Sequence, residues 1–261
     1  LVVVWDFTAI LFLLSIGTGL IIASYKVARR KSTKNVALGD SRRHDNMLLR
    51  FSKSFFPVFA FVFVLRAFVV EPFRIPSGSM IPTLLIGDFI LVNKYEYGIK
   101  SPIFNSQLIE IGRPEYGDVV VFRYPLDPST PFIKRVIGLP GDSIRIDNKH
   151  VYVNDNEVVW RDEKTYIGNH SAARHTGAKV HREIAGKNSH EVLISPNHYA
   201  VDGDFNVPPD HYFVLGDNRD NSRDSRFWGF VPKENLMGKA FYIWFNWDGG
   251  PNFARAGLRI K

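Results

Sequence analysis

The chain contains no cysteine. Disulfide bonds, thiolate metal ligands and a cysteine nucleophile are therefore all excluded. Its 261 residues, of which 45% are hydrophobic, are enough for one or two domains with a real core, which excludes a disordered chain.

Outside one segment, the chain has no net positive charge. The whole chain has a formal net charge of +7, and residues 26–53 alone hold nine Lys/Arg against two Asp, a net of +7. The remainder therefore sums to zero. A nucleic-acid-binding domain needs a basic patch on its folded surface, so we expect no nucleic-acid partner.

Charge is also nearly absent from the two apolar runs that flank this basic segment. Residues 7–24, "FTAILFLLSIGTGLIIAS", carry none, and residues 55–70, "FFPVFAFVFVLRAFVV", carry only Arg66, whose long side chain can reach the membrane interface. About 20 apolar residues cross a bilayer. A cleaved signal peptide is the alternative for the first run, but its basic stretch would precede the apolar run, whereas here it follows.

We therefore predict transmembrane helices at 1–25 and 54–70, joined by a basic loop at 26–53. An excess of Lys/Arg places such a loop in the cytoplasm. Residues 71–261 are then expected on the periplasmic or extracellular side.

Residues 71–261 lack any long stretch with a helical period. They contain short β-branched and aromatic runs bounded by Gly, Pro, Asn and Asp, which predict strands and hairpins. These runs are "DFILVNKYEYGI", "GDVVVFRYP", "PFIKRVIGLPGDSIRI", "HVYVNDNEVVW", "HYFVLGD" and "KAFYIWFNWD". Residues 161–210 are rich in His, Asn, Lys and Gly without clear alternation, and predict an insertion or small subdomain within about 147–210.

A proline-flanked turn follows the second apolar run. Ser77-Gly78-Ser79-Met80 lies between Pro76 and Pro82, so the turn can hold a hydroxyl in one orientation. Taken alone, the same residues are also typical of an ordinary solvated loop.

Lys134 favours a catalytic turn over an ordinary solvated loop. In the strand "FIKRVIG", Phe132, Lys134 and Val136 share one face. An exposed cation is the usual state of a strand lysine, but apolar neighbours would desolvate the amine and lower its pKa toward neutrality. A neutral amine can act as a general base.

A serine nucleophile needs such a base, and the usual one is histidine. His44 lies in the basic loop, and the other seven lie in or beside the expected insertion: His150, His170, His175, His181, His190, His198 and His211. A metal site at His170, His175 and His181 is the alternative for part of this set, but no HExxH or comparable spacing supports it. A pair of Ser79 and Lys134 is the more economical arrangement.

Three segments carry a family resemblance: "PSGSMIPTL", "FIKRVIGLPGD" and "GDNRDNSRDSRFWGFVP". In this order after two spans, they resemble bacterial type I signal peptidase (leader peptidase) of the Gram-negative kind, over most of the chain. The resemblance implies a mainly β, antiparallel catalytic region with a small inserted subdomain, anchored in the inner membrane with residues 71–261 in the periplasm. It implies a Ser/Lys endopeptidase that removes signal peptides from exported preproteins without cofactor or metal. Expected partners are these signal peptides, the lipid bilayer and the export translocon.

The same resemblance implies roles for single residues. Ser79 matches the nucleophile and Lys134 the general base. Ser77 matches a hydroxyl that completes an oxyanion hole with the Ser79 N–H, and Ser222 matches a serine that orients the lysine. Four residues match ion pairs that support the site: Arg135, Asp217, Asp224 and Arg226. Seven match the substrate cleft, although core positions are the alternative: Phe73, Ile75, Pro76, Met80, Leu84, Phe132 and Ile133.

The site is expected close to the membrane, because Ser79 lies eight residues past Glu71 and eight residues of extended chain span at most ~28 Å. Trp244, Phe245 and Trp247 near the end favour either the lipid headgroup region or a buried strand pair.

Two other functions compete with signal peptidase. A self-cleaving repressor uses Ser/Lys chemistry but is soluble and carries a DNA-binding domain, and a non-catalytic membrane-anchored β domain would act in binding or assembly.

Overall fold

The computed structural model describes residues 7–33, 46–101, 107–185, 188–196 and 198–261. Residues 34–45 of the expected basic loop, including His44, lie outside the described part. The chain forms two compact units, one that contains the N-terminal helices and one that begins at Val70.

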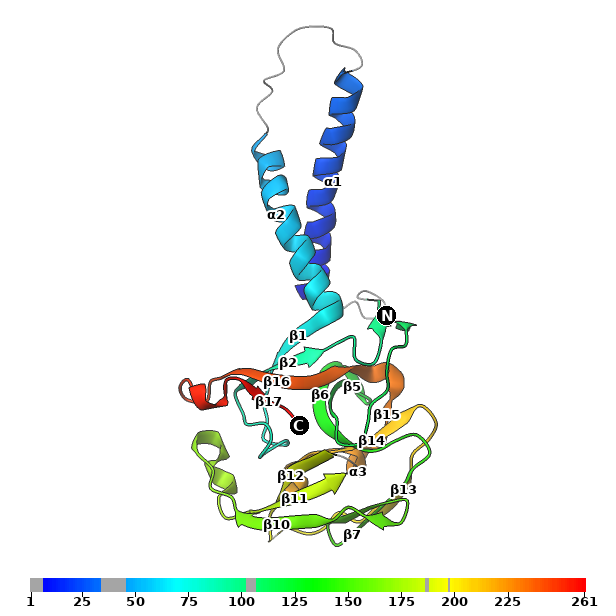
Figure 1. Cartoon of the computed structure of the whole chain (residues 1–261), viewed down its shortest axis with the longest axis vertical. Helices are drawn as coiled ribbons and strands as arrows, with labels where there is room; N and C mark the ends of the chain where they lie inside the picture. Colours follow the sequence, from blue (N-terminus) through cyan, green and yellow to red (C-terminus); the bar gives the residue numbers. More distant parts are fainter. Residues whose placement is uncertain (1–6, 34–45, 102–106, 186–187, 197) are drawn as a thin grey trace. The chain divides into compact units, whose positions relative to one another are not determined.

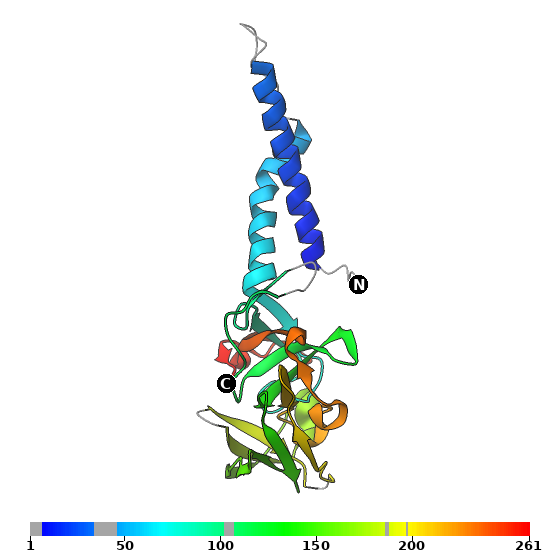
Figure 2. The ribbon, with the colours of Figure 1, turned by 90° about the vertical axis from the view of Figure 1, so that its right-hand side faces the viewer.

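The first unit contains two apolar helices that run side by side, α1 (Phe7–Thr33) and α2 (Met47–Val64), the second extended by a π-helical turn, η1 (Leu65–Val69) (Figures 1 and 2). The ring centroids of Phe12 and Phe63 lie 5.4 Å apart. Arg66 Nε donates to Thr8 Oγ1 at 3.3 Å. The segments Phe7–Arg30 and Met47–Val69 are long and apolar enough to cross a membrane.

Both helices extend beyond the predicted spans. α1 continues through the basic residues to Thr33, and α2 begins at Met47 instead of residue 54. Lys, Arg, Leu and Met are all good helix formers, so the helical backbone does not stop where the apolar run does.

The second unit is built around an eight-stranded antiparallel sheet, which confirms the mainly β prediction (Figure 1). Its strands, in spatial order, are β1 (Val70–Arg74), β2 (Asp88–Asn93), β16 (Leu236–Asn246), β5 (Val119–Tyr124), β6 (Asp127–Gly138), β14 (His211–Leu215) and β15 (Val231–Pro232), and β17 (Leu258–Arg259) pairs with β16. The first four residues of β5 are all buried, because both faces of this central strand are covered.

Smaller sheets complete this unit. One has the order β13 (Gly203–Asn206), β7 (Ser143–Asp147), β8 (His150–Val153), β9 (Asn156–Glu157), and another the order β10 (Trp160–Thr165), β11 (Lys179–Ala185), β12 (Asn188–Ile194). The remaining elements are β3 (Ile99–Lys100), β4 (Gln107–Ile109), η2 (His170–His175), η3 (Arg219–Asn221), α3 (Ser225–Trp228), η4 (Lys233–Asn235) and η5 (Phe253–Arg255).

The expected insertion is therefore largely strand. The sequence lacks visible alternation there because β10 is almost wholly exposed, so five of its six residues are polar or charged and only Trp160 is apolar. β12, at the other edge of the same sheet, reaches a loop of the main sheet, since the Leu193 N–H donates to the Asp217 carbonyl at 2.8 Å.

Candidate active site

The turn that carries Ser79 follows β1 directly. The Ile75 N–H donates to the Asp88 carbonyl at 2.8 Å, and the Gly87 N–H donates to the Ile75 carbonyl at 2.9 Å. These two hydrogen bonds hold the start of the turn against the start of β2. Ser79 is 8% exposed, and Ser77 lies at the surface. The turn thus holds Ser79 largely inside the protein, two residues from the exposed Ser77.

Lys134 lies in the middle of β6, opposite Val120 of β5. Its Nζ donates to Ser79 Oγ at 2.7 Å and to the Ile133 carbonyl at 2.9 Å, and lies 5.6 Å from the centre of the Phe132 ring. Lys134 is 4% exposed. The predicted common face of Phe132, Lys134 and Val136 is confirmed, because Val136 and Val120 belong to one buried cluster against which Phe132 packs.

Burial is the main influence on this amine. It lowers the pKa of Lys134 from 10.5 to about 8, although the carboxylates of Asp224 and Asp217 act in the opposite direction. The amine is therefore partly neutral near pH 7. A neutral Nζ at 2.7 Å from a hydroxyl is within reach to take its proton.

Ser77 lies on the same side of the turn as Ser79. Their Oγ atoms are 3.5 Å apart. Among the described residues no acceptor is found for the Ser79 backbone N–H. Both donors lie on one short turn, and the oxyanion-binding role of Ser77 stays a prediction.

The four predicted ion-pair residues form two buried pairs. Arg135 donates from Nε and Nη2 to Asp217 at 2.8 and 2.6 Å, and Arg226 donates to Asp224 at 2.8 and 2.9 Å. Burial would raise the pKa of Asp217, but the Arg135 guanidinium outweighs it and holds that pKa below the usual range. Thr83, at the end of the turn, also donates to Asp217, so the turn is attached to this pair.

Asn218 contacts the nucleophile turn directly, which the sequence analysis did not foresee. Its side-chain amide donates to the Gly78 carbonyl and its backbone N–H to the Ser79 carbonyl, both at 3.0 Å. The only sequence signal was its position in the "GDNRD" segment. The two bonds fix the carbonyls on either side of the Ser79 N–H.

Gly216 allows the loop to come this close. A Cβ at this position would lie 2.2 Å from Ser222 Oγ and 2.5 Å from the Ser79 carbonyl oxygen. The Gly216 N–H donates to Asp224 at 3.0 Å. Any side chain here would therefore push the loop away from the nucleophile.

Ser222 is buried, but its hydroxyl has no hydrogen-bond partner among the described residues. The expected hydrogen bond to Lys134 is thus not formed in this structure. Its lysine-orienting role stays a prediction.

The seven expected substrate residues divide into two groups. Ile75, Met80 and Leu84 belong to a buried cluster and are at most 3% exposed, and their substrate-binding role stays a prediction. Their apolar character serves packing under the turn. The other four keep solvent-accessible surface: Phe73, Pro76, Phe132 and Ile133.

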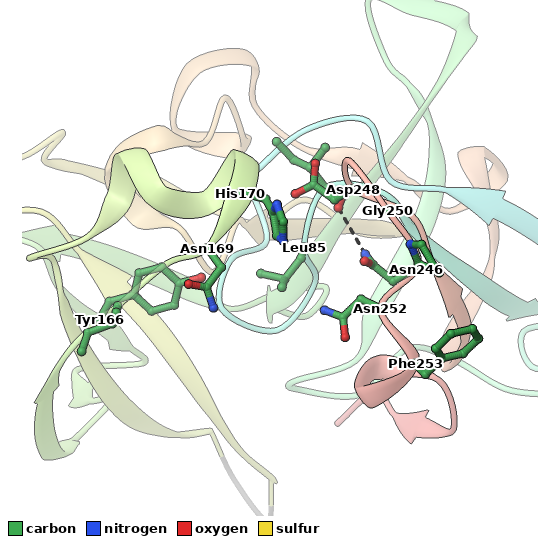
Figure 3. A pocket seen from close by; sticks show the side chains of 12 residues that line it. Leu85, Tyr166, Asn169, His170, Asn246, Asp248, Gly250, Asn252 and Phe253 are labelled. Atoms are coloured by element: carbon green, nitrogen blue, oxygen red, sulfur yellow. Dashed lines mark hydrogen bonds between the residues drawn. The ribbon is translucent and has the colours of Figure 1, made fainter.

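No group of three His, Asp or Glu residues that could hold a metal is found in the described part of the chain. His181 instead stacks on Trp160, with ring centroids 4.5 Å apart. His170 lines a cavity of about 640 Å³ between the loop after the nucleophile turn, the start of η2 and the end of β16 (Figure 3). Neither Ser79 nor Lys134 lines this cavity, so it is distinct from the dyad.

Trp244 and Trp247 lie at the end of β16 and are 45% and 50% exposed. A buried strand pair, one of the two expected alternatives, is therefore wrong for these side chains. Contact with lipid stays a prediction.

Comparisons with known proteins agree with this geometry. The family model described as "Signal peptidase, peptidase S26" matches residues 48–247. Signal peptidase I of Pseudomonas fluorescens is 43% identical over 91% of this chain and 87% of its own, and that of Pseudomonas aeruginosa is 44% identical over 81% and 79%. A crystal structure of a signal peptidase I from Enterococcus faecalis aligns with 50% of this chain and 98% of its own at 27% identity, but its TM-score of 0.34 is too low to support a conclusion.

The family model covers most of the second unit together with α2, and both Pseudomonas relatives align over more than three quarters of their own length. The chain therefore belongs to the signal peptidase family, peptidase S26, as a bacterial type I signal peptidase of the Gram-negative kind.

Proposed function

We propose that this chain is a membrane-bound serine endopeptidase that cleaves signal peptides from exported preproteins, with Ser79 as nucleophile and neutral Lys134 as general base. The observation that carries the proposal is the 2.7 Å contact between Ser79 Oγ and a lysine amine that is 4% exposed. Its family membership supports the same activity.

The reaction has two stages. The Lys134 lone pair accepts the Ser79 proton while Oγ attacks the carbonyl carbon before the scissile bond, and the ammonium then gives that proton to the leaving amine. The developing oxyanion is bound by the Ser77 hydroxyl and the Ser79 N–H, and one such donor is worth about 3 kcal/mol in other hydrolases. Water, activated by the same lysine, hydrolyses the acyl-enzyme.

The finer parts of the proposal concern location and partners. The excess of Lys/Arg in residues 26–53 supports a cytoplasmic loop and a periplasmic second unit. The exposed Trp244 and Trp247 support contact with the outer leaflet. The export translocon is a further partner, because it delivers the substrate to the same membrane.

The test uses the full chain in detergent with one preprotein. We expect the wild type to release a mature protein with a defined N-terminus, and Ser79→Ala to release none. The alternative of a non-catalytic membrane-anchored β domain requires that neither protein cleaves the substrate.

A further inference from the structure

The insertion brings a second element against the nucleophile turn. Ala172 and Ala178, in and just after η2, pack with Ile81 in one buried cluster. A Cβ on Gly78 would lie 3.4 Å from both Arg174 Nη2 and His175 Nε2. The end of η2 is thus packed beside the glycine between Ser77 and Ser79, although it lies about a hundred residues away in the sequence.

The Arg174 guanidinium is oriented by its neighbour. Its Nε donates to His175 Nε2 at 3.1 Å, and His175 is 7% exposed. Nε2 can accept only when it carries no proton. Burial and the Arg174 charge both lower the pKa of His175, which favours this neutral form. The arginine is therefore held in place without being neutralised.

The rest of the guanidinium has no carboxylate partner among the described residues, and the Arg174 residue is exposed. Arginine carries five N–H donors in a planar fork, and within the described part of the chain only one of them has an acceptor. The arrangement leaves a cation beside Gly78 of the nucleophile turn that can bind a carboxylate with two parallel hydrogen bonds.

The composition of a preprotein indicates which part of it could supply such a carboxylate. A signal peptide has a basic start, an apolar segment and small residues before the scissile bond. Acidic side chains close to the bond therefore come from the mature part. Extended chain advances about 3.4 Å per residue, so the first residues after the bond stay within reach of a group next to Gly78.

We propose that Arg174 is a specificity-determining residue that binds an acidic side chain within the first few residues of the mature protein. This inference rests on the proposed function, and it assigns a role to the insertion.

The experiment compares three substrates that differ only at the second residue after the scissile bond, which is Glu, Gln or Lys. The full chain is assayed in a zwitterionic detergent without lipid, and kcat/KM is measured for each. We expect the wild type to cleave the Glu substrate about threefold to fivefold better than the Lys substrate, as for an exposed ion pair. High salt should reduce this preference.

Variants distinguish an effect of the Arg174 charge from a structural effect of its replacement. Arg174→Gln should bring the Glu/Lys ratio to about one with little change on the Gln substrate, Arg174→Lys should keep part of the ratio, and Arg174→Glu should invert it. The matched control is Arg182→Gln, which removes an exposed arginine of β11 that lies 3.7 Å from Asp162, and should leave the ratio unchanged.

Three results would overturn the inference. The ratio could be the same in Arg174→Gln as in the wild type, all three substrates could lose activity equally, or the variant could differ from the wild type only when anionic lipid is added. The last result would assign Arg174 to the membrane instead. Cleavage of the Gln substrate by the wild type tests the proposed function separately.

Discussion

Lys134 is the residue on which the chemistry depends, and its protonation predicts a pH profile. With a pKa lowered to about 8, the neutral fraction rises about tenfold per pH unit below that value and levels off above it. We expect kcat/KM to follow this curve. Lys134→Arg should be inactive, because a guanidinium stays protonated. Rates that are constant from pH 6 to 10, or substantial cleavage by the arginine variant, would contradict the assignment.

The same lysine should reduce the stability of the fold. Between about pH 8 and 10.5 the unfolded chain binds a proton that the folded protein has released, so stability rises with pH in this window. Below pH 8 the full cost is present, about 3 kcal/mol for this shift. We therefore expect Lys134→Met to raise the free energy of unfolding at pH 7, measured by denaturant titration of the full chain in detergent.

The lost hydrogen bonds to Ser79 and Ile133 reduce this gain, so an increase of about 1–3 kcal/mol is expected. The pH supplies the control, because the difference between variant and wild type should shrink toward pH 11. A variant that is less stable than the wild type at pH 7 would mean that burial of the Lys134 amine does not reduce the stability of the fold.

At the scale of elements, the site is a junction between the nucleophile turn and the loop that begins at Gly216. Asn218 fixes the carbonyls of Gly78 and Ser79, and the Arg135–Asp217 pair holds the start of the loop against β6. Asp217 in turn accepts from the Leu193 N–H of β12. Three segments distant in sequence thus position one hydroxyl.

Gly216→Ala should separate these elements. Its methyl group would lie 2.5 Å from the Ser79 carbonyl oxygen and closer still to Ser222 Oγ. We expect a loss of stability of about 2–4 kcal/mol and loss of most activity. Thermal unfolding and preprotein cleavage measure the two effects.

Gly250→Ala is the matched control, because nothing lies within 4 Å of a Cβ at that position. It should behave like the wild type. Normal activity in Gly216→Ala would show that the loop can move without disturbing the nucleophile.

At the scale of the whole molecule, the distribution of charge predicts the topology. The chain lacks cysteine, so single cysteines report position without background. In cells with a permeabilised outer membrane, a membrane-impermeant maleimide should label Leu126→Cys, whose parent side chain is 69% exposed. Ser41→Cys in the basic segment should react only after lysis. The reverse pattern would place the second unit in the cytoplasm.

Much of this protein followed from local patterns in the sequence. Apolar runs and the basic segment predict the two helices, and alternation along β6 places Lys134 among apolar neighbours, because hydrophobicity and strand period act over a few residues. The involvement of Arg135 and Asp217 in ion pairs was expected only from the family resemblance, and the structure shows that they pair with each other. The predicted helix ends at residues 25 and 54 differ from the structure, since good helix formers continue past the apolar run.

Only the tertiary structure decided which residues meet. The Asn218 contacts, the closeness of Gly216 to Ser79 and the position of Arg174 beside Gly78 all join segments far apart in the chain. Whether Met80 and Leu84 are exposed or buried was open from the sequence, and the structure packs both in a buried cluster with residues of the main sheet. Such choices depend on which surfaces are covered after folding, which local hydrophobicity does not specify.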